Sequence, residues 1–256
     1  MSEPVPHRRG RRHGHERGFS LVELAMVLFI ISLVVGGLLV PMATQLEARQ
    51  RNEALLQLEQ IREALYGFAI IKGRLPFCTT EDDPTAATYG EEDTTCTPAS
   101  LAEDGKLPWK TLGLASGHDP WGAPRTAASD SWNGYWRYRV DPKFFATFAL
   151  STETDTTITI DIVSLNSSTS AAGAPAYDVL TSSSERPVAL VYSSGSNLVA
   201  DGQNTSYEAN ASTYEGGNVS NLDRDGDGDE DEFDDVMIWL SRPYLLSKMV
   251  AAGRLP

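Results

Sequence analysis

The chain has 256 residues, 41% of them hydrophobic, and a formal net charge of −14 at pH 7. This composition argues against wholesale disorder and against a membrane protein with many spans. Five arginines and two glutamates give residues 1–18 a charge of +3, and subtracting it from the total leaves −17 on the other 238 residues. Such an acidic surface repels a phosphate backbone, so we expect no nucleic-acid partner.

An apolar stretch follows the basic leader. Residues 19–40 read FSLVELAMVLFIISLVVGGLLV, and Glu23 is their one ionisable residue. At about 1.5 Å per residue, a helix of this length crosses a bilayer core of roughly 30 Å. The arginines predict that the leader stays on the cytoplasmic side and the bulk of the chain lies outside. No small-residue cleavage pattern follows the stretch, which disfavours an ordinary secretory signal.

Glu23 is the most informative residue of this stretch, because an unpaired carboxylate in hydrocarbon costs at least about 2.5 kcal/mol. Cleavage after Gly18 would place a cationic α-amino group on Phe19, at the depth of Glu23 on this chain or on a neighbour. The sequence Gly-Phe-Ser-Leu-Val-Glu at 18–23, between a basic leader and an apolar helix, resembles the class III signal of type IV pilins and type II secretion pseudopilins. The alternative is a plain signal anchor with a chance glutamate.

The resemblance implies cleavage by a prepilin peptidase between Gly18 and Phe19, N-methylation of Phe19, and pairing of Glu23 with the amino terminus of an adjacent pilin or pseudopilin subunit. It also implies a single-pass protein of the bacterial inner membrane that enters a filament. The expected fold is α+β, pilin-like, with a long N-terminal helix packed on an antiparallel sheet. We divide the chain into a leader (1–18), a helix (19–72) whose first half (19–40) is transmembrane, and a periplasmic head (73–256).

Periodicity supports this division. Apolar residues continue at the spacing of one helical face, and Gly73 supplies a stop; they are Leu55, Leu58, Ile61, Leu65 and Phe68. Alternation predicts strands over 135–140, 144–150, 156–165 and 187–194. For residues 236–240 we expect a helical turn, followed by a second helical piece from Pro243 to Lys248.

Two cysteines, Cys78 and Cys96, flank an acidic, turn-rich segment. The orientation predicted for the chain puts both sulfurs in an oxidising compartment, which favours a disulfide over two unpaired thiols. The bridge would close a loop of about 19 residues and contribute roughly 3 kcal/mol.

Residues 223–234 have the spacing of a calcium loop, in which a carboxylate recurs at every second position around a turn glycine, Gly228. The predicted ligands are Asp223, Asp225, Asp227, Asp229, Asp231 and Asp234. Asp235 competes with Asp234 for the last position. The region resembles the C-terminal calcium region of the major pseudopilin, and the alternative is a solvated acidic run.

Enzymatic activity is not expected, because three of the four histidines lie in the leader and His118 stands in a turn with no nucleophile motif. We therefore expect a minor pilin or pseudopilin, a structural subunit of a type II secretion pseudopilus or a type IV pilus. The alternative is a pilus-borne adhesin or ligand-binding module that uses the aromatic residues of 107–140. Burial of those aromatics would favour the structural class, and exposure would favour recognition.

Overall fold

The computed structural model describes residues 20–81, 83–96, 105–122, 134–147, 160–165, 177–182, 184–198, 201, 204, 213–216 and 233–255, without the side chains of 35–44 and 165. The chain divides into two compact units between Leu46 and Glu47. The described residues of the second unit are called the head below.

The expected N-terminal helix is α1, Leu21–Lys72. It is continuous through Pro41, and it ends where Gly73 takes a left-handed conformation with φ of 73°. Glycine adopts this conformation without the steric cost that a Cβ imposes, which explains why the helix stops there.

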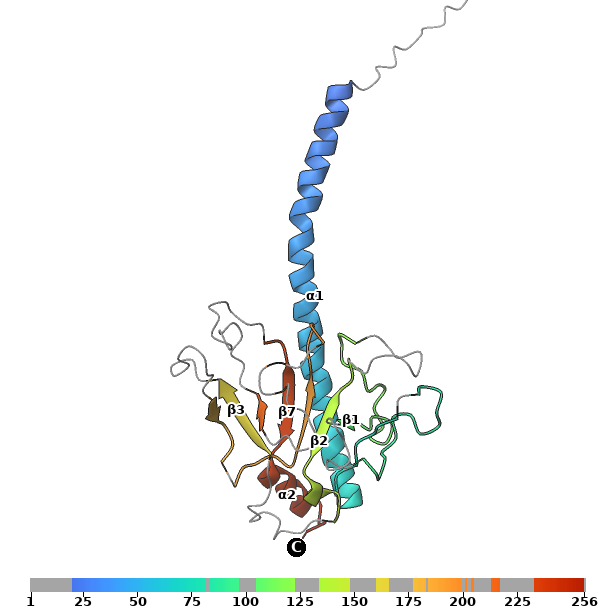
Figure 1. Ribbon diagram of the computed structural model, residues 1–256, viewed down its shortest axis with the longest axis vertical. Helices are drawn as coiled ribbons and strands as arrows, with labels where there is room; N and C mark the ends of the chain where they lie inside the picture. The colour runs from blue at the N-terminus through green and yellow to red at the C-terminus, as the bar shows by residue number, and fades with distance from the viewer. Residues whose placement is uncertain are drawn as a thin grey trace, which may run out of the picture. The chain divides into compact units, whose positions relative to one another are not determined.

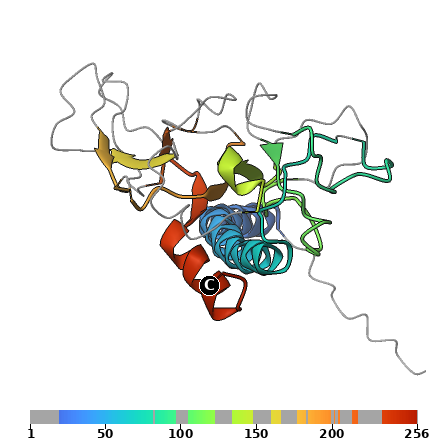
Figure 2. The same ribbon diagram turned by 90° about the horizontal axis from the view of Figure 1, so that it is seen from below.

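One face of the C-terminal half of α1 forms the centre of the main core. The residues of this face are at most 2% exposed and recur every three or four positions; they are Ala54, Leu58, Ile61, Leu65 and Ala69. Burial of one such leucine contributes about 1.5–3 kcal/mol. Figure 2 shows α2, Arg242–Ala251, beside α1. The rings of Tyr66 and Tyr244 pack edge to face between the two helices, with their centroids 5.2 Å apart.

The main sheet is antiparallel, with the strand order β1-β2-β5-β7 (Figure 1). Its strands are β1 (Gly105–Lys106), β2 (Arg137–Val140), β5 (Ala189–Ser193) and β7 (Val236–Leu240). Ala189 and Val191 belong to the core around α1, whereas Leu190 and Tyr192 belong to a second hydrophobic cluster. Both faces of the main sheet are therefore covered, as alternation along a strand requires.

A smaller second sheet contributes the other residues of that second cluster, among them Ile162 and Tyr214. It contains β4 (Tyr177–Val179), β3 (Asp161–Leu165) and β6 (Thr213–Glu215), in the order β4-β3-β6. β3 pairs with β4 in the antiparallel and with β6 in the parallel direction. The head is thus α+β, but its sheets are not wholly antiparallel as expected.

Two local predictions are wrong. Residues 236–240 form β7 rather than a helical turn, because all five pair with β5, from Ser193↔Val236 to Ala189↔Leu240. Residues 144–147 do not form a strand, since Asp141 caps a 3₁₀ turn at Pro142–Phe144, and residues 148–150 lie outside the described part.

The other predicted strands are present in shortened form. Residues 187–194 give β5 and residues 135–140 give β2. Residues 156–165 give β3 from Asp161, while 156–159 lie outside the described residues.

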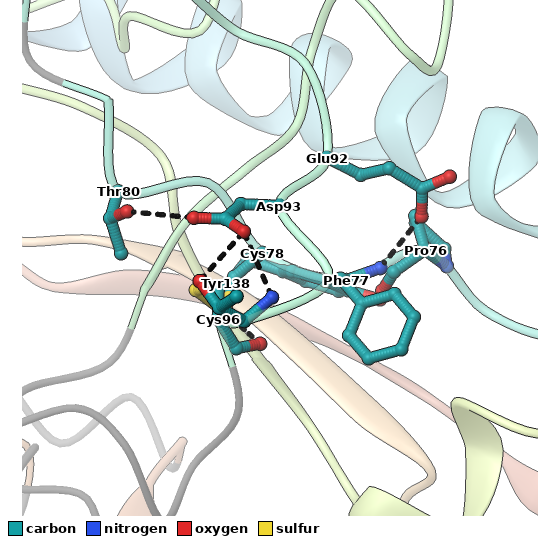
Figure 3. The surroundings of a disulfide bond; sticks show 9 residues. Pro76, Phe77, Cys78, Thr80, Glu92, Asp93, Cys96 and Tyr138 are labelled. Carbon is teal, nitrogen blue, oxygen red and sulfur yellow. Dashed lines mark hydrogen bonds between the residues drawn. A yellow bond between two sulfur atoms is a disulfide. The ribbon is translucent and has the colours of Figure 1, made fainter. Parts of the chain in front are cut away.

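The predicted disulfide is present, and its surroundings are shown in Figure 3. Cys78 and Cys96 are joined across a Cα–Cα distance of 5.4 Å, and both are buried. The loop between them is tied to the head by Glu92, which accepts two 2.8 Å hydrogen bonds from Arg74 and one of 3.1 Å from the Phe77 amide. Partial burial works to raise the pKa of Glu92, but these hydrogen bonds and the Arg74 charge outweigh it and lower the pKa.

Candidate functional site

The start of α1 contains a reciprocal capping interaction. The Ser20 amide donates to Glu23 Oε2 at 2.9 Å, and the Glu23 amide donates to Ser20 Oγ at 3.2 Å. This Ser-x-x-Glu pattern is a capping box, in which two unpaired amides at a helix N-terminus are satisfied. Glu23 thus has a partner within its own chain, which the sequence analysis missed although the pattern is visible in the sequence. Gly18 and Phe19 lie outside the described residues.

The large apolar side chains from 21 to 34 on α1 are all at least 47% exposed. An apolar surface of this extent is a site of association with lipid or with protein. Within the part of the chain that the structure describes, no helix combines the length and the hydropathy that a membrane span requires. The predicted span 19–40 is described only in part, since residue 19 and the side chains of 35–40 lie outside it.

Three aspartates, called the aspartate site below, converge in the head. Asp201 lies in the segment after β5, and Asp234 and Asp235 come directly before β7. One carboxylate oxygen from each lies within 4.8 Å of the others. Asp234 is 7% and Asp235 6% exposed.

The Oδ2 atom of each carboxylate accepts hydrogen bonds from nearby donors. Asp234 Oδ2 accepts from the Ser196 amide at 2.5 Å, from Ser196 Oγ at 2.6 Å and from the Asn197 amide at 2.9 Å. Asp235 Oδ2 accepts from the Asp201 amide at 3.0 Å and from Asn204 Nδ2 at 2.9 Å. Asp201 Oδ2 accepts from the Asp234 amide at 3.0 Å. The three carboxylates are therefore oriented by the backbone around them.

The Oδ1 atoms of Asp234 and Asp235 differ from the Oδ2 atoms. Both Oδ1 atoms are buried, and neither accepts a hydrogen bond from any described residue. A buried oxygen without a donor costs about 1–3 kcal/mol, and more when it is charged. Two such atoms beside a third carboxylate are what a cation with oxygen ligands would satisfy, so these residues could hold a metal ion.

The turn that surrounds Asp234 depends on one glycine. Gly195 has a φ of 62°, and a Cβ added to it would lie 2.3 Å from Asp234 Cγ. Because only glycine allows this approach, the turn after β5 can bring the Ser196 and Asn197 amides onto the Asp234 carboxylate.

The electrostatics of the site are unfavourable without a cation. Burial is the main cause that raises the pKa of Asp235 to about 8, hydrogen bonds from the Asp201 amide and Asn204 oppose it, and repulsion by Asp201 and Asp234 adds to it. Burial also raises the pKa of Asp201. A bound divalent cation would remove both the repulsion and the desolvation cost.

Of the predicted calcium ligands, only Asp234 lies among the described residues. Asp223, Asp225, Asp227, Asp229 and Asp231 lie outside them. Asp234 and Asp235, which compete for one position in the sequence pattern, both belong to the aspartate site. The sequence analysis missed Asp201, which stands 33 residues before Asp234 and reaches it only because β5 and β7 pair.

The aromatic cluster is mainly part of the core. Tyr135, Trp136 and Tyr138 are at most 4% exposed, Trp109 and Trp121 are partly buried, and Trp132 lies outside the described residues. The His118 ring packs on Tyr135 with centroids 4.2 Å apart. The neighbouring Asp119 accepts from Ser193 Oγ at 2.5 Å and so connects this region with β5.

Comparison with known proteins supports the interpretation of the N-terminus. The model of the prokaryotic N-terminal methylation motif matches residues 14–39. No curated protein and no solved structure matches the chain. Residues 14–39 therefore carry a prepilin-type cleavage and methylation signal. The signal implies processing by prepilin peptidase, anchoring in the inner membrane before assembly, and assembly with other pilins.

Proposed function

We propose that this chain is a minor pilin or pseudopilin, a structural subunit that assembles into a type II secretion pseudopilus or a type IV pilus through α1. The observation that carries the proposal is the methylation-motif match at 14–39, which coincides with the exposed apolar surface of α1 and with Glu23 at the helix N-terminus. Burial of Trp136 and Tyr138 supports a scaffold rather than a recognition surface.

In this proposal the prepilin peptidase cuts between Gly18 and Phe19, and the amine of Phe19 becomes a cation next to the capping box. Glu23 uses one oxygen for the Ser20 amide. A carboxylate has further acceptor capacity, so Glu23 can also accept a hydrogen bond from the amino terminus of a neighbouring subunit. The exposed apolar side chains of α1 then move from lipid into contact with neighbouring helices.

We further propose that the head binds Ca²⁺ at the aspartate site, together with carboxylates of the 223–231 segment. Calcium takes six to eight oxygen ligands, and the aspartate site supplies only three carboxylates, so a run of aspartates at every second position is a suitable complement. The ion would tie the segment after β5 to the start of β7 and so stabilise the C-terminal part of the head.

Mass spectrometry of membrane fractions tests the assembly proposal. With prepilin peptidase present we expect a mature chain that begins with N-methylated Phe19, and without the peptidase a chain that keeps its leader. Glu23→Ala should be processed but fail to enter filaments, whereas Glu47→Ala, at an exposed position of the same helix, should assemble as the wild type does. A mature chain that begins at Met1, or normal assembly of Glu23→Ala, would refute the proposal.

The second candidate function is a pilus-borne adhesin or ligand-binding module. It is favoured by a cavity of about 680 Å³ beside β7, lined by Tyr66, Trp239 and Tyr244 together with Arg62, Met237, Ile238 and Ser241. Cavities of this size and aromatic character are typical of ligand sites. Trp239→Ala should impair adhesion and leave filament formation intact if this function holds, and should affect neither process if the chain is only a scaffold.

A further inference from the structure

The side chain of Asn204 forms hydrogen bonds both to the aspartate site and to the second sheet. It is 0% exposed, and its side chain makes three hydrogen bonds. Nδ2 donates to Asp235 Oδ2 at 2.9 Å and to the Glu215 carbonyl at 3.0 Å, while Oδ1 accepts from the Glu215 amide at 2.8 Å. One amide group thus connects a carboxylate of the aspartate site to the backbone of β6.

The two bonds to Glu215 resemble those of a neighbouring strand. Among the described strands, β6 lies at the edge of the second sheet, next to β3. The carboxamide of Asn204 presents a donor and an acceptor to the backbone of Glu215, as a neighbouring strand would. Because buried backbone groups require partners, Asn204 stabilises this edge of the second sheet.

The position of β6 in turn affects how the second sheet packs on the main sheet. Tyr214 of β6 is fully buried in the second cluster with Leu190 and Tyr192 of β5. Gly216, directly after β6, lies so close to β7 that a Cβ would stand 3.0 Å from Met237 Sδ and 3.3 Å from Trp239 Cζ3. Loosening β6 would therefore loosen the contact between the two sheets.

We propose that Asn204 is a positioning residue that couples cation binding at the aspartate site to the position of β6. Because β6 belongs to the second sheet, the same coupling affects how the second sheet packs on the main sheet. The inference rests on the metal binding proposed above. A cation held by the Oδ1 atoms of Asp234 and Asp235 fixes the Asp235 carboxylate, whose Oδ2 then holds Asn204 against Glu215. Without the cation nothing holds the Oδ1 side of the Asp235 carboxyl group, and the Asn204 amide loses a fixed acceptor.

Hydrogen–deuterium exchange of the full-length chain in detergent, in Ca²⁺ and in chelator, tests the coupling. We expect amides of 213–216 to exchange about tenfold more slowly in Ca²⁺, because a fixed Asn204 side chain holds the amide and the carbonyl of Glu215 more firmly. Peptides of β2, which lies in the main sheet away from the aspartate site, should change by less than about twofold and serve as an internal reference.

Asn204→Ala should still bind Ca²⁺ by calorimetry, but the effect of Ca²⁺ on 213–216 should fall below about twofold. Thr181→Val is the matched control. It removes the 3.1 Å hydrogen bond between the Ile162 amide and Thr181 Oγ1, which loosens β3 at a point that Asn204 does not touch. Its β6 should keep the wild-type response to Ca²⁺.

The possible outcomes separate the two proposals. If the wild type binds no Ca²⁺, the proposed metal function fails and the coupling fails with it. If the wild type binds Ca²⁺ but 213–216 exchange equally with and without it, the metal site stands and the coupling is wrong. This wild-type comparison decides the matter even if Asn204→Ala does not fold. If Asn204→Ala folds and keeps the full Ca²⁺ effect, Asn204 is not the coupling residue.

Discussion

The disulfide loop and the aspartate site are both acidic, and each ties an irregular segment to the head, but they do so in opposite ways. In the disulfide loop each central carboxylate has a donor of its own, as Glu92 has from Arg74 and Asp93 from Thr95. In the aspartate site the carboxylates converge on one another, and two buried oxygens have no donor among the described residues. The carboxylates of the first region have donors on the chain, whereas two buried oxygens of the second would be satisfied by the cation proposed above.

Removal of calcium should therefore produce the largest effect. A ligand present at 1,000 times its dissociation constant stabilises the native state by about 4.1 kcal/mol. We expect chelator to lower the free energy of unfolding of the full-length chain in detergent by about this amount, measured by urea titration and tryptophan fluorescence. The aspartate site, and not the disulfide loop, should lose protection from exchange.

Asp234→Asn tests whether the aspartate site is the source of the stabilisation by calcium. It removes the charge of a proposed ligand and leaves the shape of the side chain almost unchanged. It should abolish the stabilisation by Ca²⁺. Glu91→Gln, which removes the charge of a half-exposed glutamate in the disulfide loop, should respond to Ca²⁺ as the wild type does. An equal response of Asp234→Asn and wild type would show that Asp234 is not a ligand.

Breaking the disulfide should produce the next largest effect. Replacing both Cys78 and Cys96 with serine should lower the free energy of unfolding by about 3 kcal/mol, because the unfolded chain regains the entropy of an open loop. The stabilisation by Ca²⁺ should be unchanged, since the two regions share no described contact. A loss below about 1 kcal/mol would show that the Arg74–Glu92 ion pair and the other noncovalent contacts hold the loop without the covalent bond.

Regions held by contacts between residues close in the sequence were easier to predict than regions held by contacts between distant residues. The helix stop at Gly73 and the burial of Leu58, Ile61, Leu65 and Phe68 follow from local patterns and were predictable. The prediction for Leu55 is wrong, because Leu55 is 46% exposed and Ala54 lies in the core instead. The disulfide was predictable because the chain has only two cysteines.

Non-local contacts were not predictable in this way. Val236, Trp239 and Leu240 have helical spacing, and only their pairing with β5 makes them a strand. Asp201 carries no local signal at all, because its role arises from a hydrogen bond to a residue 33 positions away. The sequence pattern predicts a cation site near the C-terminus, but it does not indicate that Asp201, in the segment after β5, lies beside Asp234 and Asp235.

The smallest predicted effect on stability concerns the Arg74–Glu92 ion pair of the disulfide loop. Glu92→Gln should lower the free energy of unfolding at pH 7 by about 1 kcal/mol, since the ion pair with Arg74 is only partly buried. Glu91→Gln breaks the exposed pair with Lys110, both partners being 47% exposed, and should cost less than about 0.5 kcal/mol. Equal losses in the two variants would contradict the importance of the Arg74 contact.

The pH dependence of the same contact has a definite sign. The pKa of Glu92 lies below its ordinary value of 4.5 in the folded state, so the unfolded chain takes up the proton first as pH falls. The stabilisation by Glu92 is therefore fully present above that value, and it is lost as pH falls through the lower pKa of the folded state. In urea titrations between neutral pH and about pH 3, Glu92→Gln should lose less stability than the wild type, because it has no proton to take up at this position. Parallel pH profiles for the two proteins would show that the Arg74 contact does not contribute to acid sensitivity, and would leave the covalent bond as the main constraint on the loop.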